Sequence, residues 1–478
     1  MSSQLDLIIR HGSVVTPAGV AVADVGIAGG RFAAIAPQLR ETGVREIDAA
    51  GLHVFPAVLD AHVHFNEPGR AEWEGLDTGS AALAAGGGAW FCDMPLNSTP
   101  PVLDGATFAE KRRLAEAKAV TDFSLWGGLV PGNLDRLGEL RDAGAVGLKA
   151  FMCGSGIDDF PGVTEAATLR AGMKRAAELG LLVAVHAEDE ALAAKLTAAA
   201  RARGATDVRS WLGTRPVAVE TAAIKLALEL AGETGCALHI VHVSSPEGIA
   251  LVSNAKRAGV NVTAETCPHY LLLNEGATIK QGAPAKCAPP LRPEATRLRL
   301  WQALRGGGVD TIGSDHSPAP PALKTAADFF SVWGGISGVQ HGFPLLIAEA
   351  LKAPPPAKGA APKREPLPEV DPVQLAETAA TVLPLLARVL ADHVAKRFAL
   401  PGKGRIEPGF DADFSLLNLA AEYELSNETV LYRHRQGPYA GRKCSVQVAR
   451  TFVRGCAVWG DGGIAPDAPK GHFVRPKV

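Results

Sequence analysis

Residues Phe55 to Gly69 read FPAVLDAHVHFNEPG, an apolar strand that ends in two histidines. Side chains alternate across a strand, so residues two positions apart point to the same side. His62 and His64 are therefore predicted to present two imidazoles at the carboxyl end of this strand. An H-x-H string alone has little specificity, because two ordinary surface histidines give the same letters. The interpretation depends on whether other strands also end in metal ligands.

Four further apolar segments do contain such a residue. They are AVGLKAF with Lys149, LLVAVHAED with His186, CALHIVHVSS with His242 and GVDTIGSDHSP with Asp315. A lone ammonium is costly to bury, so an unpaired lysine is a poor structural choice within an apolar strand. Any one of the other three residues, taken alone, has a structural interpretation. Taken together with His62, His64 and Lys149, however, these residues predict a shared metal centre. Imidazole and carboxylate are ligands of hard-to-borderline divalent cations.

The order of the elements favours an α/β fold. Both ends of the chain read as short strands with glycine and proline turns, as in Leu5–Ile9 and Ser13–Val15. Between the ends, short apolar runs alternate with alanine-rich helical stretches such as Thr78–Ala85, a pattern typical of parallel βα units. A chain of this length could also hold two or three average domains. We predict a (β/α)8 TIM-like barrel over residues 55–404 and a small β-sandwich built from residues 1–54 and 405–478.

The composition indicates a globular protein without a nucleic-acid or membrane partner. The 478 residues carry a formal net charge of −2, which gives no electrostatic case for either surface. No signal peptide and no apolar run of about 18 residues is apparent. The cysteines are scattered without a C-x-x-C pair, so no disulfide framework or zinc ribbon is expected. We expect a cytoplasmic protein, with Ala353–Pro372 as an exposed loop or flexible insertion.

The residues alone leave one question open. Two metals close together need a bridging anion, and neither the neutral nor the cationic form of Lys149 supplies one. The pattern H-x-H, K, H, H, D strongly resembles the cyclic amidohydrolases, the family of dihydroorotase, hydantoinase or dihydropyrimidinase, and allantoinase. The resemblance spans nearly the whole chain. It implies that Lys149 is carboxylated to N6-carboxylysine, a carbamate that bridges the metals.

The same resemblance implies the rest of the metal centre. It places one divalent metal on His62, His64 and Asp315, and a second on His186 and His242, with Lys149 on both. The implied metal is Zn2+, with Co, Mn, Fe or Ni as alternatives. A homo-oligomer, a tetramer, is implied in the same way.

Within this family the chain is most similar to allantoinases. The segments that carry this likeness are HFNEPGRAEWEG (His64–Gly75), DMPLNSTPP (Asp93–Pro101), ETCPHYL (Glu265–Leu271), KCAPPLR (Lys286–Arg292) and VWGGISGVQHGFPLL (Val332–Leu346). The likeness implies that a small cyclic ureide, allantoin, is opened to allantoate. Asp315 would act as general base and then as general acid.

Substrate contacts are expected around the metal ligands. If the strand direction persists past His64, Asn66 falls on the same side as the two histidines. Dihydroorotases have an arginine there, which matches a free carboxylate, whereas an amide suits an uncharged ureide. The other candidate contacts are Asn97, Ser317 and the backbone near Cys287.

Two kinds of alternative stay open. Within the same chemistry the chain could be a hydantoinase or dihydropyrimidinase, or a dihydroorotase. Hydantoinases usually carry a tyrosine downstream of the carboxylated lysine, and the segment after Lys149 reads AFMCGSGIDDFPG, without one. The other class is a catalytically silent scaffold with an amidohydrolase fold. Such a protein would typically lose ligands, whereas this chain keeps the full pattern.

Overall fold

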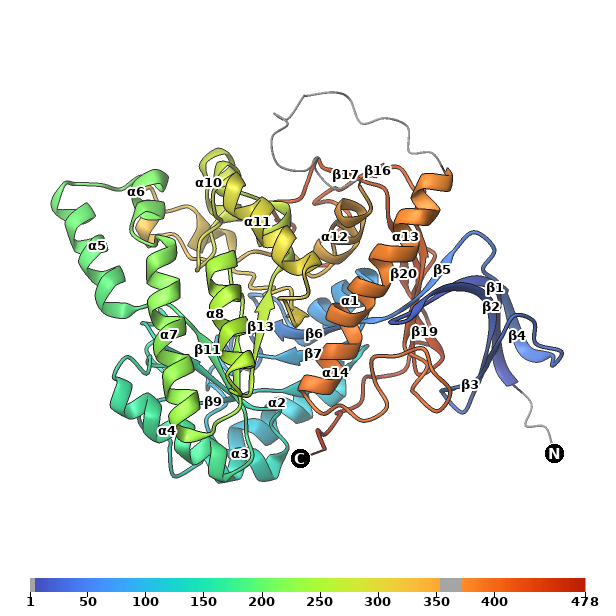
Figure 1. The fold of residues 1–478 in the computed structure, drawn as a ribbon, viewed down its shortest axis with the longest axis horizontal. Coiled ribbons are helices and arrows are strands. Elements are labelled where there is room, and N and C mark those ends of the chain that lie inside the picture. Colours follow the sequence, from blue (N-terminus) through green and yellow to red (C-terminus); the bar gives the residue numbers. More distant parts are fainter. Residues whose placement is uncertain (1–4, 353–371, 478) are drawn as a thin grey trace.

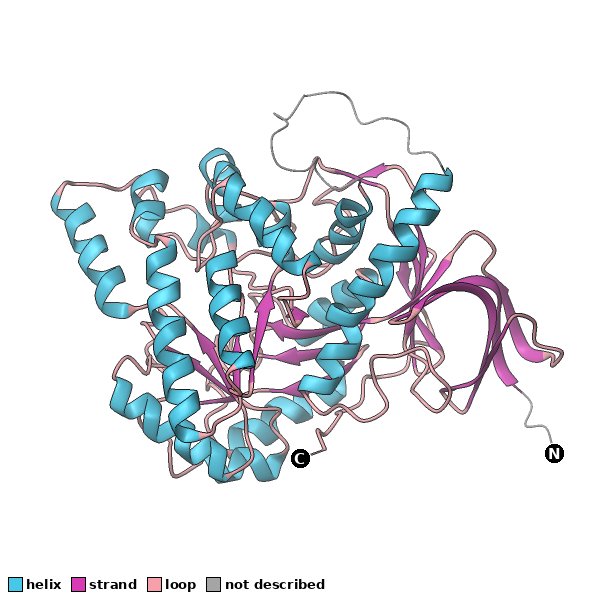
Figure 2. Ribbon diagram, in the orientation of Figure 1, coloured by secondary structure: helices cyan, strands magenta, loops and turns pink. Residues whose placement is uncertain are grey.

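A computed structural model describes residues 5–352 and 372–477. The chain forms a large α/β body with a curled sheet beside it (Figures 1 and 2). The C-terminal tail returns from the sheet to the α/β body, where Phe473 forms a parallel bridge with Phe123. The segment 353–372, which we predicted to be an exposed loop, lies outside the described residues apart from its last residue.

The α/β body is built on parallel strands. They are β6 (Val58–Val63), β7 (Gly88–Asp93), β8 (Asp122–Leu125), β9 (Gly127–Gly128), β10 (Leu148–Phe151), β11 (Val183–His186), β12 (Leu238–Ile240), β13 (Val262–Thr266) and β14 (Thr311–Ile312). The first three pair as one sheet and the other six as a second sheet. Every residue of β6 and β7 is buried, as expected for parallel strands that are covered on both faces.

Helices alternate with these strands and surround them (Figure 2). Those that follow β6 to β13 are α1 (Leu76–Ala85), α2 (Gly105–Lys118), α3 (Leu137–Ala143), α4 (Ala166–Glu178), α5 (Glu190–Ala202), α6 (Val208–Gly213), α7 (Val217–Thr234), α8 (Pro246–Arg257), α9 (Pro268–Leu272), α10 (Glu275–Gln281), η1 (Ala283–Ala285) and α11 (Glu294–Arg305). After β14 come η2 (Pro321–Lys324), η3 (Phe329–Ser331), α12 (Gly342–Leu351), α13 (Pro372–Ala387), η4 (Arg388–Asp392) and α14 (His393–Arg397). The helical stretch predicted at Thr78–Ala85 lies within α1, so that prediction is confirmed.

The end of the last parallel strand lies next to the first. The amide of His64 donates to the carbonyl of His316 over 2.8 Å, and Val63 forms a parallel bridge with His316. Deeper in the strands, the amide of Ser314 donates to the buried Asp60 carboxylate over 2.9 Å. These bonds bring the carboxyl ends of β6 and β14 to a common rim, where the predicted ligands lie.

The curled sheet contains strands from both ends of the chain. They are β1 (Leu5–Thr16), β2 (Gly19–Ala28), β3 (Arg31–Ala36), β4 (Gly43–Asp48), β5 (His53–Pro56), β15 (Phe414–Asn418), β18 (Gln447–Val453), β19 (Cys456–Gly460) and β20 (Gly463–Ile464). The two ends meet where β15 runs antiparallel to β5. The strands predicted at Leu5–Ile9 and Ser13–Val15 are one strand, because a bulge between Ile9 and Gly12 lets β1 continue. A short hairpin, β16 (Tyr423–Glu424) with β17 (Lys443–Cys444), lies apart from this sheet.

One helical run is apolar enough to meet the length and composition test for a membrane span. Val373–Arg397 has a mean hydropathy of 1.4 over its most apolar window, but Glu377, Arg388 and Asp392 interrupt its apolar residues. Its apolar side chains are used in packing instead. Leu383, Leu386 and Leu390 are fully buried, and α13 contacts β1, β2 and α12. One side of the run therefore packs between the curled sheet and the α/β body.

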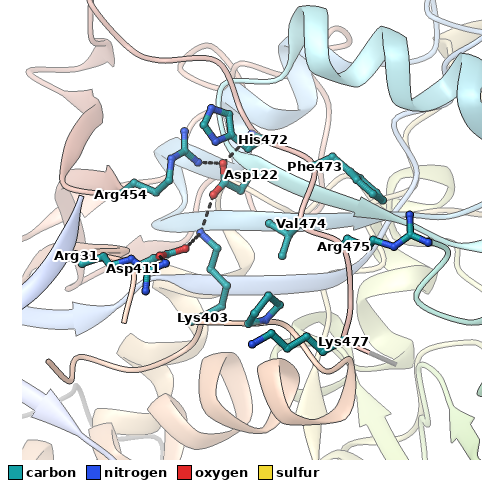
Figure 3. Close-up of a pocket in the computed structure, with 12 residues that line it drawn as sticks. Arg31, Asp122, Lys403, Asp411, Arg454, His472, Phe473, Val474, Arg475 and Lys477 are labelled. Carbon is teal, nitrogen blue, oxygen red and sulfur yellow. Dashed lines mark hydrogen bonds and ion pairs between the residues drawn. The ribbon is translucent and has the colours of Figure 1, made fainter. Parts of the chain in front are cut away.

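A buried ion cluster fixes the sheet against the α/β body (Figure 3). The Nζ of Lys403 lies 2.6 Å from Asp122, 3.0 Å from Asp411 and 2.7 Å from Asp413. Arg454 adds a second cation on Asp122. The three carboxylates are close enough together to hold a metal, but the ammonium of Lys403 already lies among them. The cluster joins the α/β body to the curled sheet, because Asp122 lies in β8 and Asp413 directly precedes β15. The cations are needed there, since several buried carboxylates without one would be strongly destabilising.

Candidate metal centre and substrate pocket

The structure brings all the predicted metal ligands to one rim. His62 and His64 lie at the end of β6, Lys149 lies in β10, and His186 ends β11. His242 and Asp315 follow β12 and β14. All six side chains are buried and all six line one cavity of about 410 Å³. Strand ends that converge in this way position catalytic groups in parallel α/β folds.

The first group consists of two histidines and a carboxylate. Asp315 Oδ1 lies 3.3 Å from His62 Nε2 and 3.4 Å from His64 Nε2. Burial alone would raise the pKa of Asp315, but the neighbouring imidazoles of His62, His64 and His242 hold it well below its usual range. The carboxylate is therefore ionised and can serve as a ligand or accept a proton.

The second group lies beside the first. His186 Nδ1 lies 3.0 Å from His242 Nε2, and the ring centroids of His62 and His242 are 5.4 Å apart. Burial lowers the pKa of His242 well below its ordinary value, so the imidazole is neutral, as a metal ligand must be. Its Nδ1 has no hydrogen-bond partner among the described residues.

Lys149 differs from the other fully buried lysines. Lys111 is paired with Asp93 at 2.9 Å, and Lys403 lies among three aspartates. Lys149, within the described residues, has no hydrogen bond or ion pair. Burial lowers its pKa to about 8. A neutral amine is the form that reacts with carbon dioxide, so this lysine has the chemistry needed for carboxylation.

The donor set fits divalent metals. The ligand atoms of His62, His64 and Asp315 lie within 4.8 Å of one another, and all are nitrogen or carboxylate oxygen. His186 and His242 direct ring nitrogens toward each other at 3.0 Å. A cation bound between them would satisfy both nitrogens.

Two carboxylates that the sequence analysis missed contact these histidines, and one of them, Glu188, lines the cavity itself. Glu265, at the end of β13, accepts from His62 Nδ1 over 2.7 Å and lies 3.5 Å from His239 Nε2. Glu188 lies 2.9 Å from His186 Nε2. Carboxylates in this position fix the tautomer and orientation of metal-binding imidazoles. The only sequence signal was their place in the strand-end segments ETCPHYL and LLVAVHAED.

The backbone around the centre adopts an uncommon conformation at several of these residues. His242 has φ 41° and Asp315 has φ 45°, both in the left-handed region that non-glycine residues seldom adopt. Each such residue costs about 1–3 kcal/mol and persists only where its surroundings over-determine it. For His242, part of the support comes from Glu265, which accepts from its amide over 3.4 Å. The fold therefore places the side chains of His242 and Asp315 in the cavity lining at the expense of local backbone strain.

The predicted substrate contacts are only partly brought together. Asn97, Cys287 and Ser317 line the cavity with the ligands, and Asn97 Nδ2 lies 3.5 Å from His64 Nδ1. Asn66 does not line it: its side chain is fully buried and donates to the carbonyl of Pro318 over 3.4 Å. The strand-alternation argument for Asn66 is wrong, because β6 ends at Val63 and Asn66 has φ 65°.

A parallel α/β fold with this set of ligands around a pocket defines a metal-dependent hydrolase of the amidohydrolase type. A family model described as dihydro-orotase-like matches residues 51–248. The chain is 46% identical over 473 residues to an allantoinase from Deinococcus radiodurans, covering 99% of each chain. It is also 46% identical to an allantoinase from Rubrobacter xylanophilus, covering 99% of this chain and 98% of that one.

The solved structures agree with this class. The fold matches an L-hydantoinase (dihydropyrimidinase) from Arthrobacter aurescens with a TM-score of 0.90 at 30% identity, covering 99% of this chain and 100% of that chain. The long alignments with the allantoinases decide the narrower assignment. The chain belongs to the allantoinase family.

The carboxylate behind His62 gives a direct test of the metal centre. Replacing Glu265 with glutamine keeps the shape but removes the charge that orients the imidazole. We expect the Glu265→Gln variant to bind divalent metal about 10–100-fold more weakly. Competition with a chromophoric chelator measures this affinity. Glu229→Gln, at an exposed position of α7, is the matched control; equal affinity in the two variants would contradict the role of Glu265.

Proposed function

We propose that this protein is a metal-dependent cyclic amidohydrolase that opens allantoin to allantoate. The identity to allantoinases over nearly the whole chain supports this substrate. The observation that carries the reaction type is the convergence of His62, His64, Lys149, His186, His242 and Asp315 on one cavity. This retention of the whole ligand set also argues against a silent scaffold.

The residues present fit two divalent metals, with zinc as the proposed pair. One ion would be held by His62, His64 and Asp315, and the other by His186 and His242. Both ions would also be bound by Lys149 in the form of N6-carboxylysine. When bound, such ions supply Lewis-acid polarisation of a carbonyl and lower the pKa of an attacking water. The low pKa of Lys149 favours its carboxylation, and its side chain lines the cavity into which the added carboxylate would extend.

Asp315 is the proposed proton carrier. Its carboxylate lines the cavity and is held ionised, so it can accept the proton of the attacking water. It then returns the proton to the ring nitrogen that leaves as the amide bond breaks. Asn97, Ser317 and the backbone near Cys287 are the proposed substrate contacts. Asn66 is not among them, because its side chain lies behind the cavity wall.

Barrel closure and a separate β-sandwich domain are also part of what we propose. We infer that the parallel strands close as a (β/α)8 barrel over residues 55–404, with residues 1–54 and 405–478 as a small β-sandwich domain. The bonds between β6 and β14, and the pairing of β15 with β5, support it. A homotetramer and a cytoplasmic location stay predictions.

A substrate panel tests the proposed reaction. Allantoin, hydantoin, dihydrouracil and dihydroorotate are compared with the zinc-loaded protein, and ring opening is followed for each. We expect the highest kcat/KM for allantoin. Preference for hydantoin or dihydrouracil would instead assign the protein to the activity named for its structural neighbours. No turnover of any member by the metal-loaded protein would favour the scaffold.

The proton-carrier role predicts a separation of metal binding from catalysis. Asp315→Asn keeps an oxygen ligand but cannot accept a proton. We expect kcat to fall by about 10²–10⁴-fold while the protein still binds metal, as measured by elemental analysis. Asp158→Asn, at an exposed position after β10, should leave both quantities unchanged. Substantial turnover by the Asp315→Asn protein would refute the assignment.

Carboxylation of Lys149 should depend on pH. Only the neutral amine reacts, and with a pKa of about 8 its fraction falls about tenfold for each pH unit below that value. At a fixed concentration of dissolved carbon dioxide, carbamate formation should therefore speed up from pH 6 to 8 and level off above. Carbon-13 NMR with labelled carbon dioxide follows the reaction. Lys149→Ala should give no such signal, and a rate that does not vary with pH would contradict the prediction.

A further inference from the structure

One wall of the cavity is formed by residues 329–335, which we call the strap. Phe330, Ser331, Val332, Trp333, Gly334 and Gly335 all line the cavity. Apart from the single turn of η3, the strap has no regular secondary structure. Its backbone carbonyls therefore need donors from elsewhere, because a buried carbonyl without a hydrogen bond is costly.

Lys286 supplies these donors. Its side chain is buried, and its Nζ donates to the carbonyls of Phe329 over 2.6 Å, Phe330 over 3.3 Å and Val332 over 2.5 Å. The contact also runs the other way, since the carbonyl of Lys286 accepts from the amide of Gly335 over 2.8 Å. A single residue thus contacts the strap near both of its ends.

The charge of Lys286 has no carboxylate partner among the described residues. Instead the ammonium lies 4.9 Å from the ring centroids of both Trp211 and Phe329, a cation–π arrangement. Burial, together with the nearby cations Arg215 and Lys324, lowers its pKa to about 7. Keeping an ammonium in this buried position costs free energy of desolvation, so its hydrogen bonds to the strap must compensate for that loss.

Other contacts determine where the strap must lie. Gly335 has φ 137°, and a Cβ at this position would meet the carbonyl oxygen of Ser317 at 2.2 Å. The strap therefore passes directly against Ser317, one of the proposed substrate contacts. The Trp333 ring packs edge-on against Trp73 with centroids 5.0 Å apart, and Lys324 donates to the carbonyl of Gly335 over 2.7 Å.

We propose that Lys286 is a positioning residue, whose ammonium holds the strap in place as the substrate-facing wall of the cavity. The inference rests on the proposed function, since it concerns how the substrate of that site is held. The metal ligands come from other segments, so loosening the strap leaves them in place. The strap would contact the substrate equally in the ground state and in the transition state. Loss of these contacts therefore raises KM with little change in kcat.

The test replaces Lys286 with methionine, which has a similar length and no charge. With the zinc-loaded full chain, we expect KM for allantoin to rise about tenfold or more and kcat to stay within about threefold. Amide hydrogen exchange in residues 329–335 should become faster, while the metal content stays the same. Lys280→Met, at an exposed position of α10, is the matched control and should change none of these values.

A second variant keeps the test decisive if Lys286→Met fails to fold. Lys286→Gln retains two N–H donors without the charge, so intermediate values of KM and of strap exchange are expected. Unchanged exchange and KM in these variants would overturn the proposal, as would a fall in kcat at constant KM. If the wild-type protein does not hydrolyse allantoin but strap exchange still depends on Lys286, the substrate assignment fails and the role of Lys286 in holding the strap stands.

Discussion

The burial of imidazoles, an amine and a carboxylate in one cavity is the constraint on which the rest of the structure depends. Groups of this kind are costly to remove from water unless each finds a partner. Glu265 provides that partner for His62 on the side away from the cavity, and Glu188, which itself lines the cavity, provides it for His186. Their opposite nitrogens face the cavity, where a cation can be bound. The proposed metal ligands His62 and His186 are thus oriented by neighbouring carboxylates as well as by the strands that carry them.

The buried lysines illustrate how differently this constraint can be met. Lys403 lies among aspartates and joins the curled sheet to the α/β body. Lys286 is surrounded by carbonyls and aromatic rings, and it contacts a segment that has little structure of its own. Lys149 has no hydrogen bond or ion pair among the residues described, and only the ring of Phe151 lies near its Nζ, 5.1 Å from the centroid. The lysine without a hydrogen bond or ion pair is the one that lies among the proposed metal ligands, where carboxylation is its proposed modification.

The proposed metal ligands lie at strand ends, whereas part of the cavity wall is formed by loops. Strand ends are rigid, so they hold the groups that must keep fixed distances, even at the left-handed backbone of His242 and Asp315. Loops such as the strap form part of the cavity wall, and they need separate contacts to stay in position. Rigid strand ends with adaptable loops are a common reason why one α/β fold serves many substrates.

The sequence by itself predicted the α/β class and the six residues that the structure brings to one cavity. Both depend on local signals, such as alternation along β6 and a charged residue within an apolar run. Local alternation was misleading at Asn66, where the strand had already ended, and at β1, where a bulge joined two predicted strands into one. The tertiary structure alone decided which residues support the ligands and the cavity wall. His62 and Glu265 are 203 positions apart, and Lys286 is 46 positions from Val332. Such pairings arise only when the strands and loops pack together, because no periodicity within one segment encodes a partner from another.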